Sequence, residues 1–258
     1  MSDLSDSELQ RYARHLVLPQ IGGIGQRRLK AAKVLVVGAG GIGSGAIPAL
    51  AGAGLGELTI VDDDVVDVSN LQRQWLFRED QVGRPKAQVA AEFVAALNPE
   101  ISVRPVTDRI DATNAADVLG GHDLIVDGSD NFATRLTVGD SATSLRIPLV
   151  SAAAAQFQAQ VGLFRGWEND QPCYRCFVGD AFDSDDCDNC AELGVIGALT
   201  GIAGNLAALL AVRHFVEFGD EVAGKLFLFD GLSLNFRTIR IPKEPACKTC
   251  GGSHAQGS

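Results

Sequence analysis

Short apolar runs alternate with amphipathic segments through the first 152 residues. The apolar runs, each of which predicts a strand, lie at 33–38, 56–62, 101–108, 123–130 and 147–154. The segments between them, each of which predicts a helix, lie at 42–54, 84–99, 112–121 and 131–146. Near-continuous apolar strands that alternate with helices are typical of a parallel sheet covered on both faces. We therefore predict an α/β fold with a mostly parallel sheet.

The pattern changes in the second half of the chain. Residues 159–165, 225–232 and 235–241 predict later strands, which we expect to be antiparallel. Residues 194–212 carry no charge and approach the length of a membrane span. We expect this segment to be a helix buried in a soluble core, because glycines and two polar residues lower its hydropathy and no basic cluster flanks it.

The first 32 residues precede the predicted sheet. Residues 5–16 predict an amphipathic helix with Leu9, Tyr12 and Leu16 on one face. Residues 21–26, with the sequence IGGIGQ, predict a loop. This part of the chain is therefore expected to form a helical arm.

The charge of the chain narrows its function. Its 258 residues carry a formal net charge of −10, and the pI is about 4.8. A nucleic-acid-binding protein usually presents a basic face, so we expect neither nucleic acid nor membrane as a partner. The opening sequence MSDLSDSELQ is polar and acidic, unlike a signal peptide. We therefore expect a cytoplasmic protein.

A glycine-rich turn follows the first predicted strand. Gly38, Gly40 and Gly43 form the pattern G-x-G-x-x-G, with a further glycine at Gly41. Such glycines let the backbone approach phosphate, and the N-terminus of the next helix favours an anion. Asp62 ends the second strand, where a carboxylate can accept hydrogen bonds from ribose hydroxyls. These features predict a Rossmann-like nucleotide site, which suits an NAD-dependent oxidoreductase as well as an ATP-dependent enzyme.

A cationic segment separates these two alternatives. Residues 69–86 carry Arg73, Arg78, Arg84 and Lys86 within a strongly acidic protein. NAD keeps its pyrophosphate over the glycine loop, whereas a triphosphate needs cations further out. Lys86 also lies in the first turn of a predicted helix, where the helix dipole disfavours a cation. The segment therefore favours ATP.

Two aspartates, Asp127 and Asp130, lie at the end of the 123–130 strand. Ligands of open α/β sheets bind at the carboxyl ends of the strands. A carboxylate there can hold Mg²⁺ on the phosphates of a nucleotide.

These motifs together resemble the ThiF/MoeB/HesA family, bacterial relatives of the ubiquitin-activating enzymes, and most of all its MoeB branch. The resemblance spans RYARHLVLPQIGGIGQ, GAGGIGS, DDDVVDVSNLQRQ, GRPK, DGSDN, PCYRC, NCAELGV and CKTC. It implies one adenylation domain over residues 1–258. Its parts would be a helical arm (1–32), a nucleotide-binding half (33–152) and a carrier-binding and zinc-binding half (153–258).

The resemblance implies an adenylyltransferase. Such enzymes use ATP and Mg²⁺ to adenylate the C-terminal glycine of a ubiquitin-like (β-grasp) sulfur-carrier protein and release pyrophosphate. They act in molybdopterin or thiamine biosynthesis or a related sulfur-transfer pathway. We therefore expect a MoaD-like or ThiS-like carrier. We also expect a separate sulfur donor, either rhodanese-like or a cysteine desulfurase, because no rhodanese-like domain follows Cys250.

Site residues carry over from the family position by position. The implied nucleotide contacts are Gly41, Asp62, Ser69, Asn70, Leu71, Gln72, Arg73, Lys86, Asp130 and Asn131. Asp130 would hold Mg²⁺, and Arg73 and Lys86 would act on the phosphates. Arg14 would reach the triphosphate from the other subunit of a homodimer.

Six cysteines form three C-x-x-C pairs, at Cys173/Cys176, Cys187/Cys190 and Cys247/Cys250. Four thiolates make a closed, structural zinc site, and spacing alone suits Cys173/Cys176 with Cys187/Cys190. The resemblance points instead to Cys173, Cys176, Cys247 and Cys250. Cys190 matches a family position that forms a covalent bond to the carrier in some members. In the MoeB branch adenylation completes the reaction, so a covalent role for Cys190 is the less favoured hypothesis.

Three other functions are open at this point. An NAD-dependent oxidoreductase is disfavoured by the cationic segment. A catalytically inactive half of a heterodimer typically lacks the phosphate arginine or the magnesium aspartate, and this chain carries both Arg73 and Asp130. A related family member could also act on tRNA or on another carboxylate.

Overall fold

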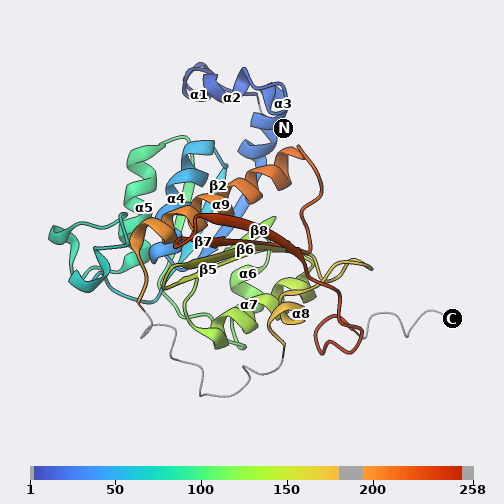
Figure 1. The fold of residues 1–258 in the computed structure, drawn as a ribbon. Helices are drawn as coiled ribbons and strands as arrows, with labels where there is room; N and C mark the ends of the chain where they lie inside the picture. The colour runs from blue at the N-terminus through green and yellow to red at the C-terminus, as the bar shows by residue number, and fades with distance from the viewer. Residues whose placement is uncertain (1–2, 180–193, 252–258) are drawn as a thin grey trace.

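One sheet runs through the protein and determines where the site lies. The computed structural model describes residues 3–179 and 194–251. Within these residues, eight strands form a sheet in the order β3-β2-β1-β4-β5-β6-β7-β8 (Figure 1). The parallel strands are β1 (Lys33–Val37), β2 (Glu57–Val61), β3 (Ser102–Val106), β4 (Leu124–Asp127) and β5 (Leu149–Ala155). The strands added in antiparallel fashion are β6 (Gln158–Phe164), β7 (Lys225–Asp230) and β8 (Asn235–Arg240). The predicted fold class, a mostly parallel α/β sheet with later antiparallel strands, is confirmed.

Helices cover both faces of this sheet (Figure 1). The helices on one face are α3 (Gly22–Ala31), α4 (Gly41–Ala53), α5 (Lys86–Leu97) and α9 (Gly197–Val216). Those on the other face are α6 (Ala115–Leu119), α7 (Phe132–Leu145) and α8 (Tyr174–Val178). Successive residues of a strand point to opposite faces, so Val34 and Val36 enter the first core while Leu35 and Val37 enter the second. Burial on both faces explains why the strand sequence is continuously apolar.

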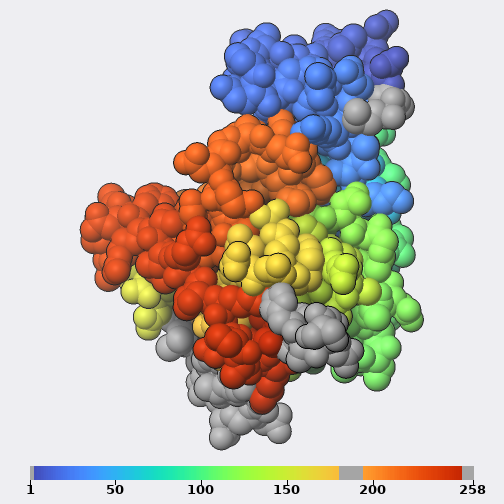
Figure 2. Space-filling model, turned by 90° about the vertical axis from the view of Figure 1, so that its right-hand side faces the viewer, coloured from blue at the N-terminus to red at the C-terminus, as the bar shows by residue number. Residues whose placement is uncertain are grey.

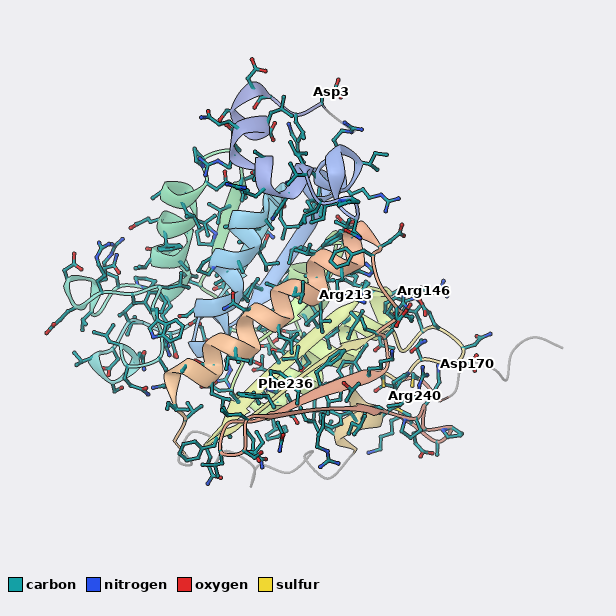
Figure 3. All side chains as sticks on the ribbon, turned by 45° about the horizontal axis from the view of Figure 1, so that its top comes forward. Asp3, Arg146, Asp170, Arg213, Phe236 and Arg240 are labelled. Carbon is teal, nitrogen blue, oxygen red and sulfur yellow. The ribbon has the colours of Figure 1, made fainter. Side chains whose placement is uncertain are left out.

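The long apolar helix α9 lies across the sheet, with Arg213 near its C-terminal end (Figure 3). It is the one helix in the described part of the chain that is long and apolar enough to cross a membrane. Of its most apolar window, 61% is buried inside the protein, against α4, β5 and β6. This packing agrees with the predicted core helix.

The N-terminal arm stands out from the body of the molecule (Figure 2). It contains α1 (Asp6–Arg11), α2 (Ala13–Leu16) and the first part of α3. The loop predicted at residues 21–26 is wrong, because α3 begins at Gly22. Tertiary contacts offset the poor helix propensity of its glycines. A Cβ on Gly25 would lie 2.8 Å from Val216, and the buried Gln26 donates a hydrogen bond to the carbonyl of Ala53 at 2.8 Å.

Candidate functional site

The glycine loop between β1 and α4 lies against the turn that follows β4. Gly38 has φ +88°, and a Cβ there would lie 3.1 Å from the carbonyl group of Gly128. A Cβ on Gly43 would lie 2.3 Å from the carbonyl oxygen of Gly38, so the helix begins directly over the turn. These two glycines let the backbone fold tightly at the carboxyl ends of the strands, as the G-x-G-x-x-G pattern predicts.

Asp62 joins the end of β2 to this loop. Its Oδ2 accepts a hydrogen bond from the backbone N–H of Ala39 at 2.7 Å, and its Oδ1 accepts one from the N–H of Asp64 at 3.0 Å. Burial raises the pKa of Asp62, although Lys86 and the two backbone donors act in the opposite direction. The carboxyl group therefore positions the glycine loop. It lies at the strand end where we expected a carboxylate to accept hydrogen bonds from ribose hydroxyls.

Lys86 is buried at the start of α5, with only 4% of its surface exposed. Its Nζ donates a hydrogen bond to Oδ2 of Asp64 at 2.9 Å. A buried lysine requires an ionic partner, and this one finds it at the same strand end that carries Asp62. Lys86, a cation where the helix dipole disfavours one, is therefore part of the candidate site and is not a solvated surface lysine.

The segment that carries Ser69, Asn70, Leu71, Gln72 and Arg73 continues from a short 3-10 helix at Val68–Asn70. Arg73 donates from Nη1 to the carbonyl of Ser69 at 3.1 Å, which orients the guanidinium along its own segment. The start of α9 packs against the same segment, because a Cβ on Gly197 would lie 2.5 Å from the carbonyl oxygen of Gln72. A small residue in α9 thus lets this helix and the cationic segment approach each other closely.

Asp130 and Asn131 lie in the turn between β4 and α7. Asp130 is exposed, whereas Asp127, at the end of β4, is fully buried. The side-chain oxygen of Asn131 accepts a hydrogen bond from the N–H of Thr134 at 3.0 Å and so caps α7. Of the two aspartates in this segment, Asp130 is the one open to a ligand.

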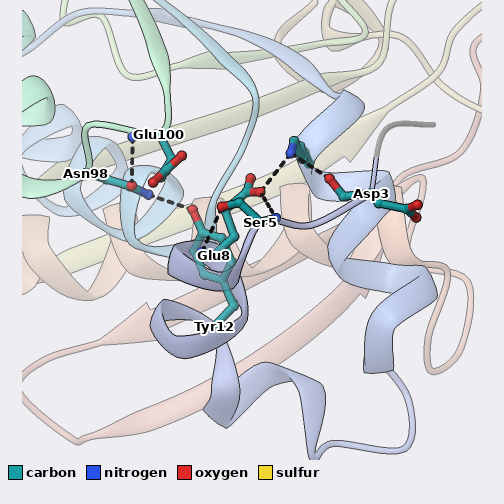
Figure 4. Close-up of polar contacts among 7 residues, drawn as sticks. Asp3, Ser5, Glu8, Tyr12, Asn98 and Glu100 are labelled. Atoms are coloured by element: carbon teal, nitrogen blue, oxygen red, sulfur yellow. Dashed lines mark hydrogen bonds and ion pairs between the residues drawn. The ribbon is translucent and has the colours of Figure 1, made fainter.

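Arg14 lies near the C-terminal end of α4. It belongs to α2, next to Tyr12, whose ring packs on Gly54 at the C-terminal end of α4. Tyr12 also accepts a hydrogen bond from the Asn98 side chain at 2.9 Å (Figure 4). The glycine loop begins α4, whose 13 residues span about 20 Å at 1.5 Å per residue. Arg14 is therefore separated from the glycine loop of its own chain by the length of that helix.

Four cysteines gather at α8, whose N-cap is Cys173. The Sγ atoms of Cys173, Cys176, Cys247 and Cys250 all lie within 4.8 Å of one another. Contacts between them measure 3.8 Å for Cys173–Cys176, 3.5 Å for Cys173–Cys247 and 3.4 Å for Cys176–Cys250. The structure thus brings together the set that the resemblance implied. Cys187 and Cys190 lie outside the described residues.

A sequence profile of the ThiF family matches residues 12–249. The chain belongs to the ThiF family. Its sequence is 42% identical over 248 residues to the SAMP-activating enzyme E1 of Haloferax volcanii, a match that covers 96% of this chain and 91% of that protein. It is 39% identical over 251 residues to the molybdopterin-synthase adenylyltransferase of Salmonella typhimurium, covering 97% and 100%. The family and the likeness to its MoeB branch are confirmed.

A solved member of the same fold gives a similar picture. The structure of Escherichia coli MccB with ATP superposes with a TM-score of 0.82 at 26% identity, and the match covers 93% of this chain and 74% of that one. Because the match covers 93% of this chain, it includes both the parallel and the antiparallel strands of the sheet.

Three further residues lie at the candidate site and were not selected from the sequence. Asp64 pairs with Lys86, as described above. Gln74 is 4% exposed, and its Oε1 has no hydrogen-bond partner among the described residues. Thr200 on α9 lies 3.0 Å from where a Cβ of Gly41 would be. Asp64 and Gln74 lie in the motif DDDVVDVSNLQRQ, so their polar side chains within that motif could have marked them as candidates. No feature of the sequence marked Thr200.

Proposed function

We propose that the protein is an ATP-dependent adenylyltransferase that activates the C-terminal glycine of a ubiquitin-like sulfur-carrier protein and releases pyrophosphate. The observation that carries the proposal is the buried Lys86, held beside Asp62 and Asp64 at the mouth of the glycine loop. A buried ammonium beyond the loop suits a triphosphate and serves no purpose for NAD. The names of the relatives agree with an adenylyltransferase, and the oxidoreductase alternative is not favoured.

The residues of the site suit this reaction. A glycine carboxylate is ionised at neutral pH, so its attack on the α-phosphate needs no general base, and catalysis consists of positioning and charge neutralisation. Asp62 would hold the ribose, while Asn70, Arg73 and Lys86 would bind the phosphates. Mg²⁺ would arrive with ATP as part of the substrate, and the exposed Asp130 is the carboxylate available to bind it.

The four-cysteine cluster would hold a structural zinc ion. A tetrahedral site with Zn–S bonds of about 2.3 Å requires sulfurs roughly 3.8 Å apart, close to the separations of Cys173, Cys176 and Cys250 given above. Such a site is closed, so zinc would tie the end of the chain to the domain and take no part in the chemistry.

The active unit would be a homodimer. Arg14 lies far from the glycine loop of its own chain, so it could act on a triphosphate only in a partner's site. The arm that carries it also exposes the apolar side chains of Leu9, Val17, Leu18 and Ile24. Exposed apolar residues that cluster on one segment are typical of an interface.

The carrier would be a MoaD-like or a ThiS-like protein, because one relative is named a molybdopterin-synthase adenylyltransferase and another a ThiS adenylyltransferase. The sulfur donor would be a separate protein, rhodanese-like or a cysteine desulfurase. A covalent role for Cys190 stays the less favoured hypothesis.

The decisive experiment is ATP–pyrophosphate exchange, measured against a panel of purified carrier proteins. One carrier should support exchange, and Asp130→Ala should abolish it. Binding of NADH without binding of ATP would contradict the proposal. Normal exchange by Asp130→Ala would remove the magnesium role alone.

A further inference from the structure

The joint between α1 and α2 is built around one buried side chain. Tyr12 ends α1 and begins α2, with only 3% of its surface exposed. Its backbone N–H donates to the carbonyl of Glu8 at 2.9 Å, and its own carbonyl accepts from the N–H groups of His15 and Leu16 at 2.8 and 3.0 Å. Arg14 follows Tyr12 by two positions. Contacts that fix Tyr12 therefore also fix the start of the helix that carries Arg14.

The ring of Tyr12 packs on the C-terminal end of α4. Gly54 ends that helix with φ +81°, a left-handed conformation that favours glycine. A Cβ at Gly54 would lie 2.4 Å from Cζ and 2.6 Å from the hydroxyl oxygen of Tyr12. Gly54 thus serves both the backbone turn and the space for the ring, and the joint rests directly on the end of α4.

Asn98 joins the hydroxyl of Tyr12 to two helix ends. It is fully buried and follows the last residue of α5. Its Nδ2 donates to the hydroxyl oxygen of Tyr12 at 2.9 Å (Figure 4), and to the carbonyl of Ala51, in the last turn of α4, at 2.8 Å. The last carbonyls of a helix need partners from outside its regular hydrogen bonding. One side-chain amide group therefore stabilises the end of α4 and holds the arm against it.

The neighbours of Arg14 are tied to the same two helix ends. Arg11 donates from Nη1 to the carbonyl of Leu97, the last residue of α5, at 3.0 Å. Nδ1 of His15 lies 2.9 Å from Oε1 of Gln26, whose own amide is bonded to the end of α4 as described above. Arg14 itself is exposed and has no hydrogen bond or ion pair among the described residues. Its guanidinium therefore stands unpaired on a segment that is fixed on both sides of it.

We propose that Tyr12 and Asn98 are positioning residues, which hold α2 so that Arg14 reaches the triphosphate in the partner's site in one orientation. This inference rests on the proposed function. Neither residue needs to touch the nucleotide. A cation that is held in place before the substrate arrives loses less conformational entropy on binding than a cation on a mobile arm. The joint would therefore increase the contribution of Arg14 to catalysis.

Tyr12→Phe tests this role, because it removes the hydroxyl and keeps the ring on Gly54. The hydrogen bond from Asn98 to the carbonyl of Ala51 can remain, so the end of α4 keeps its partner. We expect pyrophosphate exchange to fall about fivefold, the scale of one neutral hydrogen bond. Equal rates in the variant and the wild type overturn the proposal.

Mixing with Lys86→Ala shows through which subunit the loss acts. Equal amounts of the two variants are combined, and subunit exchange is demonstrated by energy transfer between labelled chains. If Tyr12 acts through Arg14, each mixed dimer has one intact site, and activity should rise about threefold above the mean of the two homodimers. A side chain that only stabilised its own subunit would leave the mixture at that mean, and this result overturns the proposal.

Thr59→Val is the matched control, because it also removes one buried hydroxyl. Thr59 is fully buried on β2, and its hydroxyl forms a hydrogen bond with His122 at 2.9 Å, a contact that involves no residue of the arm. The variant should unfold at a lower temperature and keep wild-type pyrophosphate exchange. If it loses as much pyrophosphate exchange as Tyr12→Phe does, the loss reflects general destabilisation and the proposal fails.

Amide hydrogen exchange separates this inference from the proposed function. The N–H groups of His15 and Leu16, which donate to the carbonyl of Tyr12, should exchange faster in Tyr12→Phe than in the wild type, with or without ATP. If no carrier supports pyrophosphate exchange by the wild type, the proposed function fails, and unchanged protection of these two amides would still overturn the positioning role. An active wild type with unchanged protection in Tyr12→Phe overturns this inference alone.

Discussion

The ammonium nitrogen of Lys86 lies 2.9 Å from Oδ2 of Asp64, with the lysine side chain 5% exposed and the aspartate side chain 69% exposed. The lysine is therefore held in place by a partner that faces solvent. Because Asp64 faces solvent, incoming phosphates can reach Lys86 and replace this carboxylate as its ionic partner, so that the buried ammonium stays paired. We interpret Asp64 as the residue that orients Lys86 until the nucleotide binds.

Replacing Lys86 by methionine should therefore remove a phosphate contact. We expect pyrophosphate exchange to fall about 10²–10³-fold, as for loss of one charge-stabilising group. Arg78→Met is the control, because Arg78 comes from the same cationic segment but is exposed and pairs with Asp80. It should retain near-normal exchange. Equal losses in both variants would mean that general charge, not the placement of Lys86, drives binding.

The candidate nucleotide site could be predicted from the sequence because its parts are local. Strand ends, the glycine turn and the 69–86 segment each lie within one short stretch, and parallel strands bring those stretches to the same edge. The burial of Lys86 could not be predicted from these local patterns. Lys86 was selected because it contradicted the helix dipole, and only the packing of α5 shows it to be buried.

The errors and omissions come from contacts between distant segments. The glycines of residues 21–26 predicted a loop, but Gly25 is required for packing against Val216, so α3 forms in spite of them. Spacing alone suited Cys173/Cys176 with Cys187/Cys190, because it carries no information on where the end of the chain returns.

Glu8 predicts a pH dependence of stability. Its carboxylate accepts hydrogen bonds from the N–H of Ser5 and from Nζ of Lys30, both at 2.7 Å, at the start of the arm (Figure 4). Burial alone would raise its pKa, but Lys30 and Ser5 outweigh that effect and lower the pKa below the usual 4.5. The stabilisation is therefore complete above pH 4.5 and is lost as pH falls through the lowered value.

Glu8→Gln should lower the unfolding temperature at pH 7 and reduce its further decline on acidification. Glu79→Gln, at an exposed residue, should behave as the wild type at both pH values. Thermal unfolding followed by circular dichroism from pH 7 to pH 3 checks both expectations. A Glu8→Gln curve that parallels the wild type would show that the arm does not contribute through this carboxylate.

Zinc should be present at one ion per chain. Cys250→Ser should lose the ion and unfold at a lower temperature, because metal binding to a structural site is coupled to folding. Cys187→Ser should lose neither zinc nor stability. Metal analysis of the purified variants, together with thermal unfolding, distinguishes the two cases. Loss of zinc from Cys187→Ser with retention in Cys250→Ser would assign the ion to the pairs at residues 173–190.

The position of Arg14 predicts complementation between subunits. A two-fold interface repeats every contact in both directions, so each site would combine Lys86 of one chain with Arg14 of the other. Arg14→Ala and Lys86→Ala homodimers should both be nearly inactive in pyrophosphate exchange. Mixed in equal amounts and allowed to exchange subunits, half of the dimers become heterodimers, each with one intact site and one doubly altered site. Activity should then recover to roughly a quarter of the wild type.

The alternatives give different results in the same experiment. If Arg14 served its own chain, every site would keep one altered residue, and mixing would restore nothing. If Arg14 were only a solvated residue of α2, Arg14→Ala would be active before mixing. Subunit exchange must be shown independently, for example by energy transfer between labelled subunits, because without it a failure to recover activity would have the same appearance as action within one chain. Recovery near one quarter, with exchange shown, can arise only when the two altered residues serve the same site from different subunits.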